Sequence, residues 1–180
     1  MRRLPAILLV FAATLATSQN PAAPAGPTPQ QQVMEYFVGN WSLQGTQKIS
    51  PTAPPAEFTG KEQSAWTQGG YFVETHTDIH GPLGDVRSTR VMEYNPKSHL
   101  YLYNVYNSLG EHIIAIGHLD GNVWTWKATE KLNGVIAETR YTFNFVSKDS
   151  YTFKEELQPS PKGAWVTVMQ GTATRATQAQ

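Results

Sequence analysis

The sequence predicts an all-β protein, an antiparallel up-and-down barrel of about ten strands with a short N-terminal helix. Three observations lead to this fold class. From residue 40 onward, polar and apolar residues alternate with the period of two that is typical of strands. Turn sequences rich in Gly, Asn, Asp, Ser and Pro separate these segments at short, regular intervals. Connections this short join sequential antiparallel neighbours, and such a long meander curls to remove its edges. A two-sheet sandwich is the alternative architecture.

The chain begins with the pattern of a secretory signal peptide. Arg2 and Arg3 precede an apolar stretch over residues 4–15, and small residues follow. The apolar stretch is shorter than the roughly 20 residues that span a bilayer. We therefore expect residues 1–18 to be removed after Ser18. The mature protein would then be secreted, to the periplasm or the extracellular space, without a membrane anchor.

Residues 19–29 consist mainly of Pro and Ala and predict a flexible linker, because this composition cannot bury a core. The barrel domain is expected over residues 30–176, followed by a disordered tail over residues 177–180. A short helix opens the domain, since Thr28 and Pro29 form a helix N-terminal signal. Four apolar residues then recur at helical spacing: Val33, Met34, Phe37 and Val38.

The alternating segments between turn signals predict the strands in order. Their ranges are Asn40–Ile49, Glu57–Thr67, Tyr71–His80, Asp85–Tyr94, His99–Asn107, Glu111–Leu119, Asn122–Thr129, Val135–Val146, Tyr151–Leu157 and Ala164–Thr174. On the first strand the inward face is clear and carries Trp41 and Leu43. The phase of the third to sixth strands stays open, and a wrong phase would exchange lumen and surface. A barrel of this strand number tends to enclose a cavity.

Composition excludes several classes of function. The 180 residues suit a single domain, and 40% hydrophobic residues suffice for a core. Fourteen basic and 14 acidic residues balance without a basic run, which argues against nucleic acid and anionic membranes as partners. The absence of cysteine excludes disulfides, a lipid-modified cysteine and a cysteine nucleophile.

Several segments resemble a bacterial family of exported, lipocalin-like β-barrel proteins classed as a domain of unknown function. They include Gly39–Trp41 ("GNW"), "GGYFVETH", "YNPKSHLYLYNVYNSLG", "GHLDGNVWTW", "RYTFNFVSKDSYTFKEEL" and "MQGTATR". The likeness runs over residues 37–175 and extends distantly to the calycin group of lipocalins, fatty-acid-binding proteins and nitrobindins. In that group a G-x-W tryptophan closes one end of the barrel beneath an arginine. The resemblance assigns this structural role to Trp41, with either Arg140 or Arg175 as its partner.

Cofactors and metals are not expected. The nitrobindin resemblance implies a haem-ligating histidine on a late strand, but this chain has no histidine after His118. His76 and His80 are too far apart along a strand to share a metal by themselves. Such a site would need His112 or His118 from a neighbouring strand.

Candidate ligand-binding residues are those on the strand faces expected to point into the lumen, together with aromatic residues that could line it. These are Glu62, Trp66, His76, Arg90, Tyr103, His118, Trp124, Trp126, Arg140, Tyr141 and Phe153. Glu62 either orients a ligand or stays wet at a barrel end. Glu155 can face inward with Tyr151 and Phe153, and Trp165 can also line the lumen. An internal Arg90 or Arg140 would favour an acidic amphipathic ligand.

These observations favour a carrier or sensor that binds a small hydrophobic or amphipathic molecule without a cofactor. Hydrolase, phosphate-binding and zinc-protease motifs are absent from the sequence. Two alternatives remain open. One is a hydrolase or isomerase that uses His76 with Glu62 or Glu74, and the other is a filled-lumen scaffold that binds another exported protein on its outer face.

Overall fold

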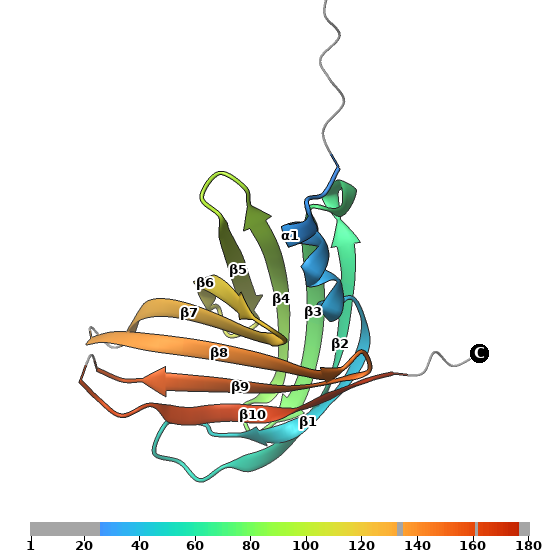
Figure 1. The fold of residues 1–180 in the computed structure, drawn as a ribbon. Helices are drawn as coiled ribbons and strands as arrows, with labels where there is room; N and C mark the ends of the chain where they lie inside the picture. Colours follow the sequence, from blue (N-terminus) through green and yellow to red (C-terminus); the bar gives the residue numbers. More distant parts are fainter. Residues whose placement is uncertain (1–25, 133–134, 161, 177–180) are drawn as a thin grey trace, which may run out of the picture.

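Ten antiparallel strands form a closed barrel in the computed structural model, which confirms the predicted fold class (Figure 1). The structure describes residues 26–132, 135–160 and 162–176. The expected signal peptide, residues 19–25 of the expected linker and the expected tail lie outside the described residues. Each strand pairs with its neighbour in sequence, and β1 pairs with β10 to close the barrel. This closure excludes the two-sheet sandwich.

The strands agree with the predicted segments to within a few residues. They are β1 (Gly39–Gln47), β2 (Ala56–Thr67), β3 (Phe72–Gly81), β4 (Gly84–Asn95), β5 (Leu100–Asn107), β6 (His112–Asp120), β7 (Val123–Leu132), β8 (Val135–Ser147), β9 (Ser150–Gln158) and β10 (Val166–Arg175). A short 3-10 turn, η2 (Gln68–Gly70), joins β2 to β3. Odd-numbered strands run away from the end that holds the N-terminal helix, so the loops after β1, β3, β5, β7 and β9 form the opposite mouth.

The predicted helix is present, but it is split into α1 (Pro29–Gln32) and a 3-10 turn, η1 (Val33–Phe37). Thr28 caps it in a reciprocal box: its Oγ1 accepts from the Gln31 amide, and the Gln31 side chain accepts from the Thr28 amide at 2.7 Å. Met34 and Phe37 are buried beneath the helix. No helix within the described ranges is long and apolar enough to cross a membrane.

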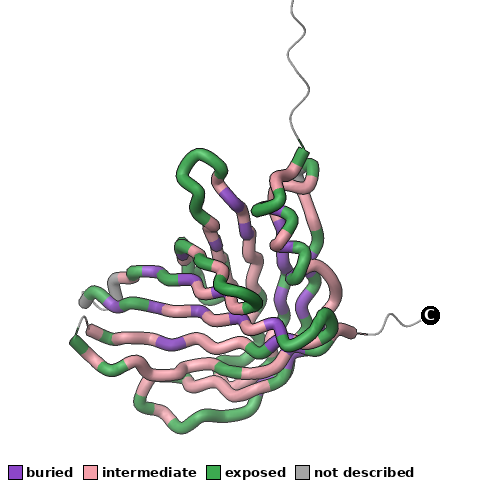
Figure 2. Tube along the Cα trace, viewed as in Figure 1, coloured by how far each residue is buried: buried purple, intermediate pink, exposed green. Residues whose placement is uncertain are grey.

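Alternation along each strand settles which residues face the interior (Figure 2). On β3, Val73, Thr75 and Thr77 are buried, whereas His76 and Asp78 are exposed. On β6, Ala115 is buried and the residues on either side of it are exposed or half-buried. The phases that the sequence left open are therefore fixed by these buried positions.

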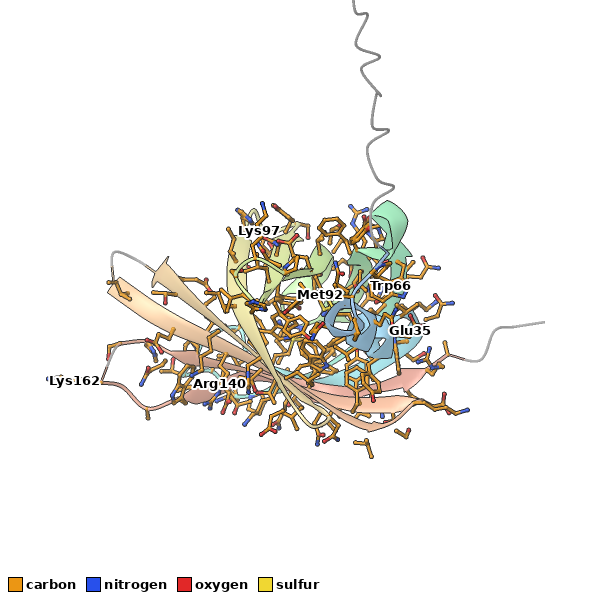
Figure 3. The ribbon with its side chains drawn as sticks, turned by 45° about the horizontal axis from the view of Figure 1, so that its top comes forward. Glu35, Trp66, Met92, Lys97, Arg140 and Lys162 are labelled. Atoms are coloured by element: carbon orange, nitrogen blue, oxygen red, sulfur yellow. The ribbon has the colours of Figure 1, made fainter. Side chains whose placement is uncertain are left out.

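Aromatic side chains fill the helix-covered half of the barrel. Trp124 and Trp126 stack with ring centroids 5.4 Å apart, and Phe37 packs edge-on against Trp124. Gly117 makes this packing possible, because a β-carbon there would overlap the Trp126 ring. Met92 lies within the same packed interior (Figure 3). This half of the barrel is a solid core.

Candidate functional site

One end of the barrel is closed by a tryptophan and an arginine. Trp41 is 1% exposed, and its Nε1 donates to the Phe37 carbonyl at 2.9 Å. The Arg175 guanidinium stacks on the Trp41 ring and donates to the carbonyls of Val38 and Lys148. Gly39 has a φ of 136°, and a β-carbon there would collide with Arg175. The G-x-W sequence is thus explained by closure of the barrel.

Trp124 and Trp126, expected to line a ligand site, belong instead to the solid core. Both are fully buried, and neither lines the cavity at the mouth. Their Nε1 atoms have no hydrogen-bond partner among the described residues. Both tryptophans point inward, as expected, but they lie in the helix-covered half of the barrel, away from the cavity at the opposite mouth. This expectation is corrected.

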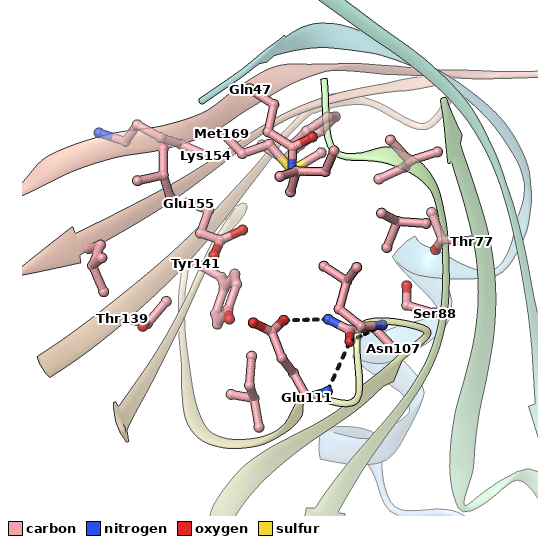
Figure 4. A pocket seen from close by; sticks show the side chains of 18 of the residues that line it. Gln47, Thr77, Ser88, Asn107, Glu111, Thr139, Tyr141, Lys154, Glu155 and Met169 are labelled. Carbon is pink, nitrogen blue, oxygen red and sulfur yellow. Dashed lines mark hydrogen bonds between the residues drawn. The ribbon is translucent and has the colours of Figure 1, made fainter. Parts of the chain in front are cut away.

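A cavity of about 350 Å³ occupies the mouth half of the lumen (Figure 4). It reaches the surface between the loops after β1, β3 and β5, which contribute Ser50, Leu83 and Leu109. Its apolar walls come from strands around the barrel and include Leu43, Ile79, Val86, Ile113, Leu157 and Met169. The volume lies at the lower end of the roughly 300 to 1,000 Å³ found for small-molecule sites.

The floor of this cavity is a buried charged network. Glu62 on β2 forms an ion pair with Arg90 on β4, and both side chains are largely buried. Tyr151 donates to Glu62 Oε1 at 2.9 Å, and Arg90 Nη1 donates to the Tyr103 hydroxyl at 3.1 Å. Thr77 Oγ1 lies 3.5 Å from Glu62 Oε2. Arg90 Nε has no partner within the described part of the chain. Five strands (β2, β3, β4, β5 and β9) therefore hold a fixed polar floor beneath apolar walls.

The electrostatics of the floor follow from burial and pairing. Burial lowers the pKa of Arg90, but the Glu62 charge and the neighbouring tyrosines raise it above its usual value. Burial is also the largest cause that raises the pKa of Tyr151, followed by the charge of Glu62. Arg90 thus stays protonated and Tyr151 stays a hydrogen-bond donor at neutral pH.

A second polar group, of acidic residues with a tyrosine, lies on one wall of the cavity. Glu155 on β9 faces the lumen beside Tyr141 on β8, and Glu111 lies nearby (Figure 4). Burial, followed by the charges of Glu130 and Glu111, raises the pKa of Glu155 to about 7. Burial and Glu155 likewise raise the pKa of Tyr141. At neutral pH this wall carries an incompletely ionised carboxyl group.

Five of the predicted ligand-binding residues come together around the cavity: Glu62, Arg90, Tyr103, Tyr141 and Phe153. The alternative that Glu62 is a solvated residue at a barrel end is wrong, because its side chain is buried and paired with Arg90.

The two histidines proposed for the lumen lie outside the barrel. The His76 side chain is 61% exposed and forms an ion pair with Glu74 at 2.8 Å. His118 is exposed on the outer face of β6. The cause in both cases is the strand phase, since the inward positions are taken by Thr75 and Thr77 on β3 and by Gly117 and Leu119 on β6. In the described ranges no three metal-ligating side chains gather into a metal site.

Three further expectations are corrected. Trp66 lies at the helix end, where its indole donates to Glu35 (Figure 3). Arg140 points outward, pairs with Glu156 at 2.7 Å and stacks on the Trp165 ring. Arg140 is therefore not the partner of Trp41, and neither Arg140 nor Trp165 lines the cavity.

Glu111 and Glu130 are cavity residues that were not among the predicted site residues. The alternation on β7 could have identified Glu130, which continues the inward face of Trp124, Trp126 and Ala128. Glu111 likewise continues the inward face of Ile113 and Ala115, but the phase of that strand could not be read from the sequence.

Comparison with known proteins supports the fold. A family described as "Protein of unknown function (DUF1579)" matches residues 26–175. The crystal structure of Rv2717c from M. tuberculosis is similar, with a TM-score of 0.60 and 15% identity over 83% of this chain and 99% of that chain. A structure of EF1p2_mFAP2b bound to DFHBI has a TM-score of 0.42 and 9% identity over 81% of this chain and 98% of that chain. No protein with a curated description matches significantly.

Proposed function

The chain belongs to the DUF1579 family of proteins of unknown function, and we propose that it binds a small amphipathic molecule in the mouth half of its barrel. The observation that carries this proposal is the cavity of about 350 Å³, whose apolar walls stand on a fixed polar floor. The apolar walls of this cavity are not covered by other side chains, so a ligand that buries them gains binding free energy.

The division of the lumen supports binding over a purely structural role. Large aromatic side chains, including Trp124 and Trp126, are fully buried and packed together in the helix-covered half. In the mouth half, small and medium residues such as Ser88, Ile113 and Val86 stand where larger ones would fill the space. The filled-lumen scaffold therefore agrees with only one half of the barrel.

The position of His76 argues against the hydrolase or isomerase alternative, in which His76 would act as the base. That alternative required His76 beside a lumen carboxylate, but His76 is exposed outside the barrel and contacts Glu74. Among the described residues that line the cavity, none is a histidine. The cavity carboxylates and tyrosines are therefore assigned to ligand recognition.

Binding can be tested with the neutral fluorescent dye N-phenyl-1-naphthylamine and a pair of matched variants. Ser88 lines the cavity, whereas Thr89, next to it on β4, does not. We expect a saturable rise in dye fluorescence with the wild-type protein and with Thr89→Phe. Ser88→Phe should abolish it by filling the lumen. Equal binding by both variants, or no binding by the wild type, would contradict the proposal.

We further propose that the protein is exported, which is supported by the cationic and apolar sequence of residues 1–18. Fractionation of the producing cells and N-terminal sequencing test this. A mature chain beginning at Gln19 outside the cytosol is expected. A cytosolic chain that retains its first residues would contradict it.

A further inference from the structure

Three carboxylates that form no salt bridge with any described residue line the mouth half of the cavity. Glu155 comes from β9, Glu130 from β7 and Glu111 from the loop before β6. Glu130 accepts a hydrogen bond from Thr139 at 2.8 Å, and Glu111 accepts one from Asn107 at 2.5 Å. Both partners are neutral. Across the described residues, none of the three carboxylates is in a salt bridge.

The basic residues that line the cavity do not form ion pairs with these three carboxylates. Arg90 is already paired with Glu62 at the floor. Lys154 directs its Nζ to Glu156, 3.0 Å away, in the group that also contains the outward-facing Arg140. Lys48 remains at the rim. Paired charges cancel at the floor, so the unpaired charge of the cavity wall is mainly negative.

Tyr141 supplies an independent indication of a missing partner. It is only 9% exposed, and its hydroxyl makes no hydrogen bond within the described part of the chain. Figure 4 shows the residue at the cavity wall beside Glu155 and Glu111. This hydroxyl is open to the cavity rather than sealed in the core, so it faces the space that a ligand would occupy.

Building on the lumen binding proposed above, we propose that the ligand is an organic cation, a protonated amine on an apolar body. The ammonium group would lie among Glu111, Glu130 and Glu155, with the Tyr141 hydroxyl accepting one of its hydrogen bonds. The apolar body would cover walls such as Ile79 and Ile113. An internal arginine was expected to favour an acidic ligand, but Arg90 is already paired with Glu62, and for this reason we favour a cation.

Three octyl compounds of equal chain length separate the contribution of charge from that of apolar burial. Octylamine, 1-octanol and octanoate are titrated into the wild-type protein by calorimetry at pH 8, where Glu155 is mostly ionised. We expect octylamine to bind about tenfold more tightly than 1-octanol, and octanoate more weakly than both. Octanoate binding as tightly as octylamine, or equal affinity for all three, would overturn the cation preference while leaving lumen binding intact. If none of the three binds, lumen binding itself fails, and the cation proposal fails with it.

Single carboxylate variants locate the effect. Glu155→Gln and, separately, Glu130→Gln should each lower octylamine affinity several-fold while leaving 1-octanol affinity within about twofold. Glu138→Gln is the matched control, because Glu138 is exposed on the outer face of β8. Circular dichroism confirms that each variant is folded. Unchanged octylamine affinity in both lumen variants, or an equal loss in Glu138→Gln, would overturn the assignment.

Discussion

The guanidinium of Arg175, near the end of the last strand, lies 4.2 Å from the ring centroid of Trp41 on the first strand. The same guanidinium donates to backbone carbonyls of Val38 and Lys148, so one side chain joins three segments of the chain. This contact closes the end of the barrel opposite the cavity. It connects β1 and β10, the first and last strands of the barrel.

Arg175→Met should therefore destabilise the protein by about 2 to 4 kcal/mol, since it removes charge-assisted hydrogen bonds and a cation–π contact. Urea unfolding measures the loss. Arg140→Met is the control, because Arg140 stacks on Trp165 at the outer surface. It should cost about 1 kcal/mol or less. Equal losses in the two variants would contradict a special role for Arg175 in closure.

Removing one partner of the buried floor pair should cost more than removing both. Arg90→Met leaves Glu62 buried without its cation and should lower the free energy of unfolding by about 3 to 5 kcal/mol. The double variant Arg90→Met with Glu62→Met should regain a substantial part of that loss, measured by the same denaturant titration. A double variant no more stable than Arg90→Met alone would show that the penalty does not come from the unpaired carboxylate.

Gly117→Ala should destabilise the filled half of the barrel by about 1 to 3 kcal/mol, because its β-carbon would overlap the Trp126 ring. Thermal unfolding followed by circular dichroism checks this. His118→Ala, next in the chain and exposed, should change stability by only about 0.5 kcal/mol. A neutral Gly117→Ala variant would mean that the stacked tryptophans have room to move.

The raised pKa of Glu155 predicts a pH dependence of stability. Its carboxyl group is neutral in the folded protein up to about pH 7, but ionises near pH 4.5 when unfolded. The unfolded chain therefore holds fewer protons between these values, and stability falls as pH rises through that window. Relative to Glu155→Gln, the wild type should be equally stable at pH 4 and less stable by about 1 to 3 kcal/mol at pH 8.

Unfolding of both proteins across this pH range provides the measurement. Glu138→Gln controls for the general effect of removing a carboxylate. Glu111 and Glu130 face Glu155 and contribute to its raised pKa, so Glu130→Gln should reduce the difference. A constant stability difference between wild type and Glu155→Gln at all pH values would refute the titration of a buried carboxyl group.

The sequence predicted those features that alternation and turn spacing determine. On β1 one face was clearly apolar, so Trp41 was placed inside the barrel and is buried there. Glu62 on β2 was a lumen candidate with a wet barrel end as the alternative, and its side chain is buried. On β3 the inward face carries Thr75 and Thr77, whose hydroxyls bond within the lumen. A polar inward face looks like a surface face, and for this reason His76 was assigned to the wrong side.

Depth along the barrel and pairing across it could not be read from alternation. Trp126 and Tyr141 both point inward, yet only Tyr141 reaches the cavity. The difference depends on the stagger between strands and on Gly117, against which Trp126 packs. The choice between Arg140 and Arg175 as the partner of Trp41 likewise required the pairing of β1 with β10.

The most direct test of the central claim is methyl NMR of isoleucine-labelled protein titrated with N-phenyl-1-naphthylamine. Ile79 and Ile113 line the cavity, whereas Ile114 and Ile116 are exposed on the outer face of β6. Ile113 and Ile114 are adjacent in the chain and therefore control for each other. Binding in the lumen predicts shifts for the Ile79 and Ile113 methyl groups and none for Ile114 and Ile116. Shifts confined to Ile114 and Ile116 would place the ligand outside the barrel and contradict the proposed function.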